Sequence, residues 1–220
     1  MVLGISMNSS KEYCLKKLFY PVVLYLIAVM LLSCTAKRIE IQYYEGSLND
    51  RLKSLESIQS IKSAFSVEFD RGDNVTIKGE GILRLSGEDL DLQVYSMGFL
   101  VAEVNADGSG IRSDPPISKN RLLMLVDGLR NSFFWWDMKE YSVKDEGDNF
   151  ILTNSWKRLI IDKKTMMPLR LKIDLDDGNR LDISYYEPSD INGFVFPSKI
   201  RIELLNYAVN LKIKDMEIKE

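Results

Sequence analysis

Most of the chain beyond its first quarter alternates apolar and polar side chains, which is typical of β-strands with one buried and one solvated face. Leu169, Leu171 and Ile173, for example, alternate with Arg170 and Lys172. Gly, Asp and Asn clusters separate the alternating runs, as hairpin turns require. The pattern predicts about eleven strands, at 63–70, 75–86, 90–96, 99–106, 141–146, 149–154, 158–162, 168–175, 180–186, 195–205 and 208–217.

Two segments follow the helical period instead. Ser47 is a suitable N-cap, and Leu and Ile recur after it at helical spacing, which predicts a helix over 48–60. The segment 117–138 carries a second helical face and ends in the aromatic run Phe133–Trp136. We expect a short helix and an aromatic plug set against the concave face of the sheet.

These elements predict a mainly β fold with a few helices. Because so many strands have one apolar face, the sheet must curl into a barrel, a half-barrel or a sandwich to cover it. Few helices are available to help, so the sheet itself has to provide most of the enclosure.

The first 34 residues are organised as an export signal. Lysines precede an uninterrupted apolar run of 15 residues, Leu18–Leu32, whereas a stable membrane span needs about 20. The run ends in Leu-Leu-Ser-Cys, which resembles the lipobox of bacterial lipoproteins and implies cleavage after Ser33 and acylation of Cys34. The alternative is an uncleaved anchor helix with an incidental cysteine.

The chain is therefore expected to have three parts: a signal peptide (1–33), a lipidated N-terminus with a tether (34–46), and a single domain (47–220). The signal can start at Met1 or Met7. Thr35, not Asp, follows the cysteine, and under the sorting rule of enteric bacteria this favours the periplasmic face of the outer membrane.

Charge and composition narrow the classes of function. The net charge is −3, and the segment before Cys34 has three lysines and one glutamate, so the rest carries −5. With no basic stripe, we expect no nucleic-acid partner. Only Cys34 would remain after cleavage, which excludes an internal disulfide framework. Histidine is absent, and we expect neither an enzyme nor a metal or cofactor.

The elements together resemble the LolA/LolB family of lipoprotein carriers, which are half-open antiparallel barrels with helices over an apolar concave face. Four features carry the resemblance: a helix directly before the sheet, the apolar turn Tyr95–Leu100, the helical and aromatic segment 120–136, and Phe194–Ile200 at the start of a long strand. Where LolB proteins have a Pro-Leu-Gly-like turn, this chain has Ser-Met-Gly. The lipid anchor makes it more similar to LolB, the outer-membrane receptor, than to LolA, the soluble shuttle.

The resemblance implies a curled antiparallel half-barrel of about eleven strands with a helical lid. It also implies that a hydrophobic cavity binds acyl chains of lipoproteins or lipids, received from a periplasmic carrier, and helps insert them into the outer membrane. Shielding is needed because each methylene in water costs about 0.8 kcal/mol. The expected lining is Leu83, Leu85, Leu92, Val94, Ala102, Val104, Leu122, Leu125, Phe133 and Trp136. The alternative for each residue is ordinary core packing.

The turn after residue 96 is the second expected site. Met97, Gly98, Phe99 and Leu100 would form an apolar tip, and exposed apolar tips usually mark a partner or membrane contact. In LolB-like proteins the matching turn residue is implicated in delivering cargo to the membrane, a role that comes to Met97 by position and to Phe99 by proximity. The alternative is a loop folded under a neighbouring segment.

A second function class stays open on the sequence alone. The chain can instead be a structural or regulatory envelope lipoprotein that binds another protein through the same concave sheet. A carrier needs an interior that opens to solvent, whereas an interaction module can have a closed core.

Overall fold

The computed structural model describes residues 43–70, 76–191 and 194–220. The chain divides into two compact units, residues 1–40 and 41–220, and every described residue lies in the second unit. The predicted signal, the lipidation site Cys34 and the predicted turn at 71–74 lie outside the described residues.

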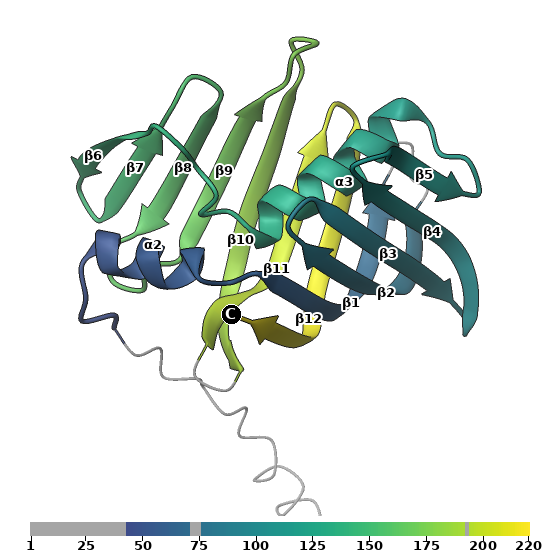
Figure 1. Ribbon diagram of the computed structural model, residues 1–220, viewed down its shortest axis with the longest axis horizontal. Helices are drawn as coiled ribbons and strands as arrows, with labels where there is room; N and C mark the ends of the chain where they lie inside the picture. The colour runs from purple at the N-terminus through teal and green to yellow at the C-terminus, as the bar shows by residue number, and fades with distance from the viewer. Residues whose placement is uncertain (1–42, 71–75, 192–193) are drawn as a thin grey trace, which may run out of the picture. The chain divides into compact units, whose positions relative to one another are not determined.

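The described residues form twelve strands and two helices (Figure 1). In chain order these are α2 Leu48–Glu56, β1 Ser60–Asp70, β2 Thr76–Ser86, β3 Asp89–Ser96, β4 Phe99–Asp107, β5 Gly110–Asp114, α3 Lys119–Phe133, β6 Ser142–Glu146, β7 Asn149–Thr153, β8 Lys157–Asp162, β9 Pro168–Asp174, β10 Arg180–Ile191, β11 Phe194–Leu204 and β12 Tyr207–Lys219. All strands belong to one antiparallel sheet in the order β5-β4-β3-β2-β1-β12-β11-β10-β9-β8-β7-β6. The sheet curls without closing, which confirms the predicted fold class.

One strand was missed, and the ends of two predicted elements were wrong. The strand β5 was missed because its five side chains are mostly exposed and show no apolar alternation. The first helix ends at Glu56 rather than at residue 60, because the following isoleucine, Ile61, pairs in β1 with both neighbouring strands. The strand β10 continues past Tyr186 to Ile191, through a Glu-Pro sequence that resembles a turn.

Glycines and β-bulges curve the part of the sheet formed by β1, β2 and β3. A Cβ on Gly81 would lie 2.2 Å from Cε2 of Phe65, and a Cβ on Gly79 would lie 2.5 Å from the Tyr95 carbonyl oxygen. Two bulges lie beside these strands: Lys214 is the extra residue in β12, opposite Ala64 and Phe65, and Val101 is the extra residue in β4, opposite Val94 and Tyr95. Because glycine has no side chain, the Phe65 ring and the β3 backbone approach β2 closely, and the sheet bends there.

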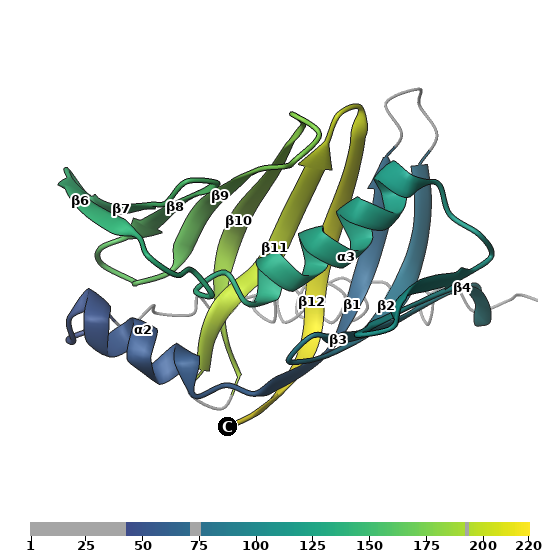
Figure 2. The same ribbon diagram turned by 45° about the horizontal axis from the view of Figure 1, so that its top comes forward.

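The helix α3 lies across the concave face of this sheet (Figure 2). Its buried face includes Met124, Leu129 and Phe133. At Gly128 the helix touches β11, since a Cβ there would stand 2.8 Å from Cγ2 of Ile202. Neither helix in the described ranges 43–70, 76–191 and 194–220 has the length and hydropathy to cross a membrane.

The short helix α2 closes one end of the curled sheet. Ser47 caps it as predicted: its hydroxyl accepts a hydrogen bond from the Asp50 N–H at 3.2 Å, and Asp50 binds back to Ser47. Three leucines of α2 are buried in the same hydrophobic core as α3. The described members of this core lie within the compact unit of residues 41–220.

Candidate functional site

The predicted cavity residues meet between the sheet and α3, but they meet as a closed core. Leu83, Leu92 and Val104 are directly opposite one another across β2, β3 and β4, and each is at most 1% exposed. The other predicted residues are buried or half-buried nearby, namely Leu85, Val94, Ala102, Leu122, Leu125, Phe133 and Trp136.

Little free space is left in this interior. A small cavity of about 20 Å³ lies where the aromatic plug meets α2 and the first residues of β11, lined in part by Phe133, Trp136 and Phe196. This volume holds about one water molecule, not an acyl chain. In the described residues α3 covers Leu83, Leu92 and Val104 (Figure 2), and the role of these residues in ligand binding stays a prediction that requires α3 to move.

The aromatic plug, residues 133–136, is itself tightly packed. Trp136 makes edge-to-face contacts with Trp135 and Phe134, at centroid distances of 5.4 and 5.5 Å. The buried Lys157 ammonium donates to the Asp137 carbonyl oxygen at 2.9 Å, directly after the plug. Burial lowers the pKa of Lys157, opposed by nearby Asp137. The plug is thus joined to β8 by a desolvated hydrogen bond.

Polar contacts also attach the C-terminal end of α3. The Tyr185 hydroxyl donates to the Asn131 carbonyl oxygen at 3.4 Å, and burial raises the pKa of Tyr185 well above its usual value, so it stays a donor. The Arg130 guanidinium donates to the Glu88 carbonyl oxygen in the β2–β3 turn. This end of the helix is therefore attached on two sides, through the Asn131 backbone carbonyl and through the Arg130 side chain.

The N-terminal end of α3 is held differently. The Arg121 guanidinium lies over the neighbouring rings of Phe69 and Tyr207, 5.3 and 5.4 Å from their centroids. The N-cap Ser118 makes no side-chain capping bond, and Leu122 in the first turn is only half-buried. Cation–π contacts contribute about 0.5–2 kcal/mol each. The N-terminal end of α3 is therefore the easier end to release from the sheet.

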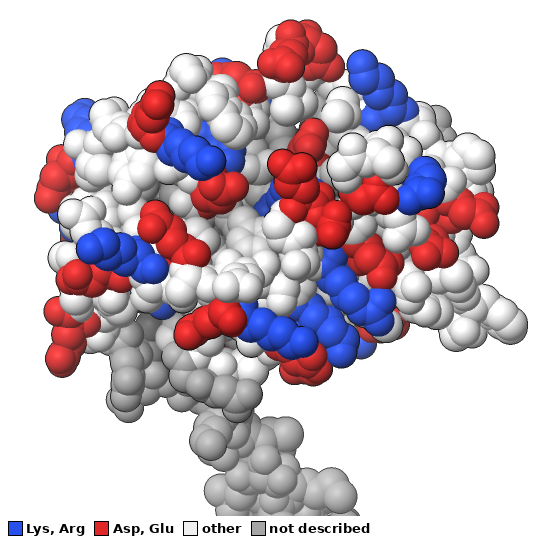
Figure 3. All heavy atoms as spheres, viewed as in Figure 1, with Lys and Arg blue, Asp and Glu red and all other residues white. Residues whose placement is uncertain are grey.

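The predicted apolar tip is exposed. Met97 and Gly98 have φ values of 51° and 82°, as a two-residue type I′ hairpin turn requires. Met97 is 87% exposed, Phe99 74% and Leu100 50%. The end of the β3–β4 hairpin projects from the body without a charged residue at its tip (Figure 3). Its role in contacting a membrane stays a prediction.

One feature of the tip was missed from the sequence. Only the second half of β4 pairs with β5, from Glu103 to Asp107. Among the described residues, Phe99–Ala102 therefore has a partner strand on one side only. The 43% exposed Val101 extends the apolar surface along this edge. We call Met97, Phe99, Leu100 and Val101 the apolar tip.

The face of the sheet opposite α3 carries a groove of about 870 Å³ next to the apolar tip. This site was also missed, because outward residues such as Glu80 alternate with apolar ones and resemble a plain solvated face. Only the strand register, which sequence alternation does not provide, brings its side chains into one row.

No sequence-family model matches this chain, and no curated protein is significantly similar to it in sequence. Solved structures do share its fold. A LolA superfamily protein from Nitrosomonas europaea has a TM-score of 0.53 and 12% identity, over 80% of this chain and 95% of that chain. A DUF1329 family protein from Desulfovibrio piger has a TM-score of 0.56 and 11% identity, over 78% and 90%.

A third structure, an outer membrane lipoprotein-sorting protein domain from Vibrio parahaemolyticus, has a TM-score of 0.48 and 9% identity, over 78% of this chain and 91% of that chain. At 11–12% identity, the first two likenesses show the fold alone. The chain is a LolA-like half-barrel: one open, curled antiparallel sheet with a helix across its concave face. The predicted resemblance to the LolA/LolB family is confirmed at this level.

Proposed function

We propose that this protein is a lipid-anchored envelope protein that binds acyl chains of lipoproteins or lipids beneath α3 and helps insert them into the outer membrane. The observation that carries the proposal is the unequal attachment of α3 over an apolar interior. Its C-terminal end and the plug are held by partly buried hydrogen bonds, whereas its first turn is held by Arg121 and the half-buried Leu122. The fold shared with a LolA superfamily protein supports the same function.

Release of the first turns of α3 would expose the inward faces of β2, β3 and β4. Acyl chains would then replace Leu122 and Leu125 against Leu83, Leu92 and Val104. Each buried methylene contributes about 0.8 kcal/mol, so a few methylenes offset the loss of the Arg121 contacts, which contribute about 0.5–2 kcal/mol each. Binding of this kind is reversible, because the closed core re-forms when the chains leave.

The anchor and the exchange partner complete the proposal. Acylation of Cys34 would hold the protein on the periplasmic face of the outer membrane, with residues 35–46 as the tether to the half-barrel. A soluble periplasmic carrier would deliver the acylated cargo, and the apolar tip would contact the bilayer that receives it.

Native mass spectrometry tests the carrier function. Residues 41–220, produced with membranes and extracted mildly, are expected to retain a sub-stoichiometric set of acyl species of several chain lengths. The Leu122→Gln/Leu125→Gln variant is the control, since polar side chains on α3 should lower the acyl-bound fraction. Protein free of acyl species in every preparation would contradict the carrier function.

The closed interior favours a second candidate, an envelope lipoprotein that binds another protein. The half-open edge of β4 at Phe99–Ala102 would serve it, since an unpaired strand edge can accept a further strand. Co-purification of one protein at equal stoichiometry, with no acyl species, would support this candidate over the carrier.

The apolar tip makes the membrane-contact prediction testable. We expect the Met97→Glu/Phe99→Glu variant of residues 41–220 to lose binding to phosphatidylcholine vesicles by about a hundredfold, because burial of each side chain contributes about 1.5–3 kcal/mol. Vesicle co-flotation measures the effect. Val143→Glu/Leu205→Glu is the matched control, since these residues are 48% and 59% exposed elsewhere on the sheet. Equal binding by the two variants would exclude a membrane role for the tip.

A further inference from the structure

The groove on the face opposite α3 is built from one row of directly paired residues. The strand register places them in line across six strands, in the order Tyr95, Glu80, Ser66, Lys212, Lys199 and Tyr186. All six line the groove of about 870 Å³, together with Met97 and Gly98 of the hairpin turn. The row therefore runs from the base of the apolar tip to β10.

Two lysines face each other in the middle of this row. Lys199 and Lys212 are directly opposite across β11 and β12, and like charges in that position destabilise a sheet. Lys199 forms an ion pair with Glu187, whereas Lys212 forms none with the described residues. A pairing that costs stability and leaves one ammonium uncompensated favours a negatively charged ligand at this position.

The groove lining as a whole carries more positive than negative side chains. Four cationic residues and two carboxylates line the groove, and both carboxylates already have partners. Glu80 forms an ion pair with Lys214, and Glu68 pairs with Lys78 at 3.5 Å. The groove is thus a locally cationic site on a chain whose net charge is −3. Among the described residues only Lys199 of the lysine pair has a counter-charge, so an anion in the groove would meet the uncompensated Lys212.

The two ends of the row indicate which anion fits. Tyr95 and Tyr186 combine an apolar ring with a hydroxyl, the composition that proteins use at the boundary between lipid and water. The turn residue Met97 lines the same groove and is 87% exposed. The groove therefore begins at a residue of the apolar tip and continues along the sheet to the lysine pair.

We propose that this groove holds the phosphate-bearing headgroup of an anionic phospholipid, bound by Lys199 and Lys212 in the row between Tyr95 and Tyr186. The proposal rests on the membrane contact of the apolar tip made above, and it adds a lipid preference to that contact. The tip supplies apolar insertion into any bilayer, and the groove selects bilayers that carry anionic lipid.

Vesicle co-flotation with residues 41–220 tests this site. Two kinds of vesicle are compared: phosphatidylcholine alone, and an equimolar mixture with phosphatidylglycerol. The unsubstituted protein should bind the mixed vesicles more tightly, and added salt should remove the difference. Lys199→Gln/Lys212→Gln should bind the mixed vesicles about thirtyfold less tightly and bind phosphatidylcholine as before.

The control is a second cationic pair on the same face. Arg158 and Lys172 are directly opposite across β8 and β9 but do not line the groove. Arg158→Gln/Lys172→Gln makes the same change in net charge, so it should retain most of the preference for anionic vesicles. Thermal unfolding of both variants checks that each is folded.

The outcomes separate this site from the proposed function. If Lys199→Gln/Lys212→Gln and Arg158→Gln/Lys172→Gln lose the same amount of binding to mixed vesicles, a general charge effect explains that binding. This result would overturn the proposed headgroup site. Equal affinity of the unsubstituted protein for both vesicles would also overturn it and would direct attention to an acidic protein surface. In either case, weaker phosphatidylcholine binding by Met97→Glu/Phe99→Glu would still support the proposal that the tip contacts the membrane.

Discussion

A disulfide between positions 128 and 202 is expected to abolish acyl binding, and reduction is expected to restore it. A Cβ on Gly128 would lie 2.8 Å from Cγ2 of Ile202, and Ile202→Cys removes that methyl, so the two Cβ atoms come within the range of a disulfide. The bond would tie α3 to β11 in the closed position. Ligands that bind only an open state cannot bind a protein locked shut.

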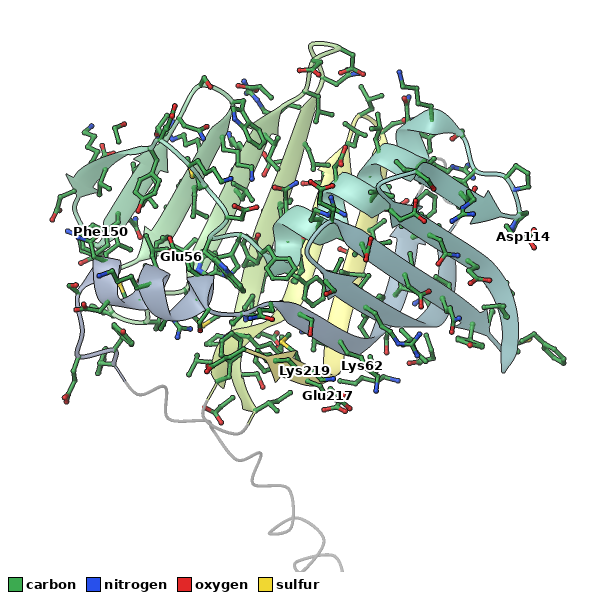
Figure 4. The ribbon with its side chains drawn as sticks, viewed as in Figure 1. Glu56, Lys62, Asp114, Phe150, Glu217 and Lys219 are labelled. Atoms are coloured by element: carbon green, nitrogen blue, oxygen red, sulfur yellow. The ribbon has the colours of Figure 1, made fainter. Side chains whose placement is uncertain are left out.

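The measurement is fluorescence of a dansyl-labelled fatty acid added to oxidised and reduced protein. Residues 41–220 contain no native cysteine, so Gly128→Cys/Ile202→Cys can form one bond only. The control disulfide is Lys62→Cys/Glu217→Cys, which joins directly paired residues of β1 and β12 far from α3 (Figure 4). Acyl binding by the oxidised 128–202 protein equal to that of the control would refute opening of α3.

Phe65→Ala is expected to lower the free energy of unfolding by about 3–5 kcal/mol. Phe65 is 1% exposed, and its ring covers Gly81 at the point where the sheet bends. Gly81→Ala should cost about 1–3 kcal/mol in the unsubstituted protein, because the new methyl would lie 2.2 Å from a buried ring atom. Urea unfolding measures both values.

The double variant Phe65→Ala/Gly81→Ala tests whether the two residues contact each other or destabilise the core independently. With the ring removed, Gly81→Ala should become neutral or stabilise the protein by about 0.5–1 kcal/mol, since alanine loses less backbone entropy than glycine. The two substitutions would then be strongly non-additive. Gly108→Ala is the control, because a Cβ there meets no atom within 4 Å. Additive losses for Phe65 and Gly81 would mean that the ring does not lie on the glycine.

The location of the apolar tip could be predicted because its signal is local. A two-residue turn with Gly98, flanked by alternating strands, defines a hairpin end, and no neighbour in sequence can cover Met97 or Phe99. The open edge of β4 could not be predicted in the same way. It depends on β5 being only five residues long and pairing from Glu103 onward.

The packing of the interior and the outer groove could not be predicted from the sequence pattern. Alternation assigned Leu83, Leu92 and Val104 correctly to one inner face, but it carries no information about how deeply α3 sits on that face. One contact that bears on this depth is at Gly128, where the helix approaches Ile202 more closely than a larger residue would allow.

By itself, the amino-acid order determined the class of fold, the hairpin ends and the side of each strand that faces the core, because turn chemistry and period-two alternation act between near neighbours in sequence. Tertiary structure alone decided that the interior is closed and that Lys199 stands opposite Lys212. Both outcomes depend on packing and register between segments far apart in the chain, where each contact forms only once the whole sheet has curled.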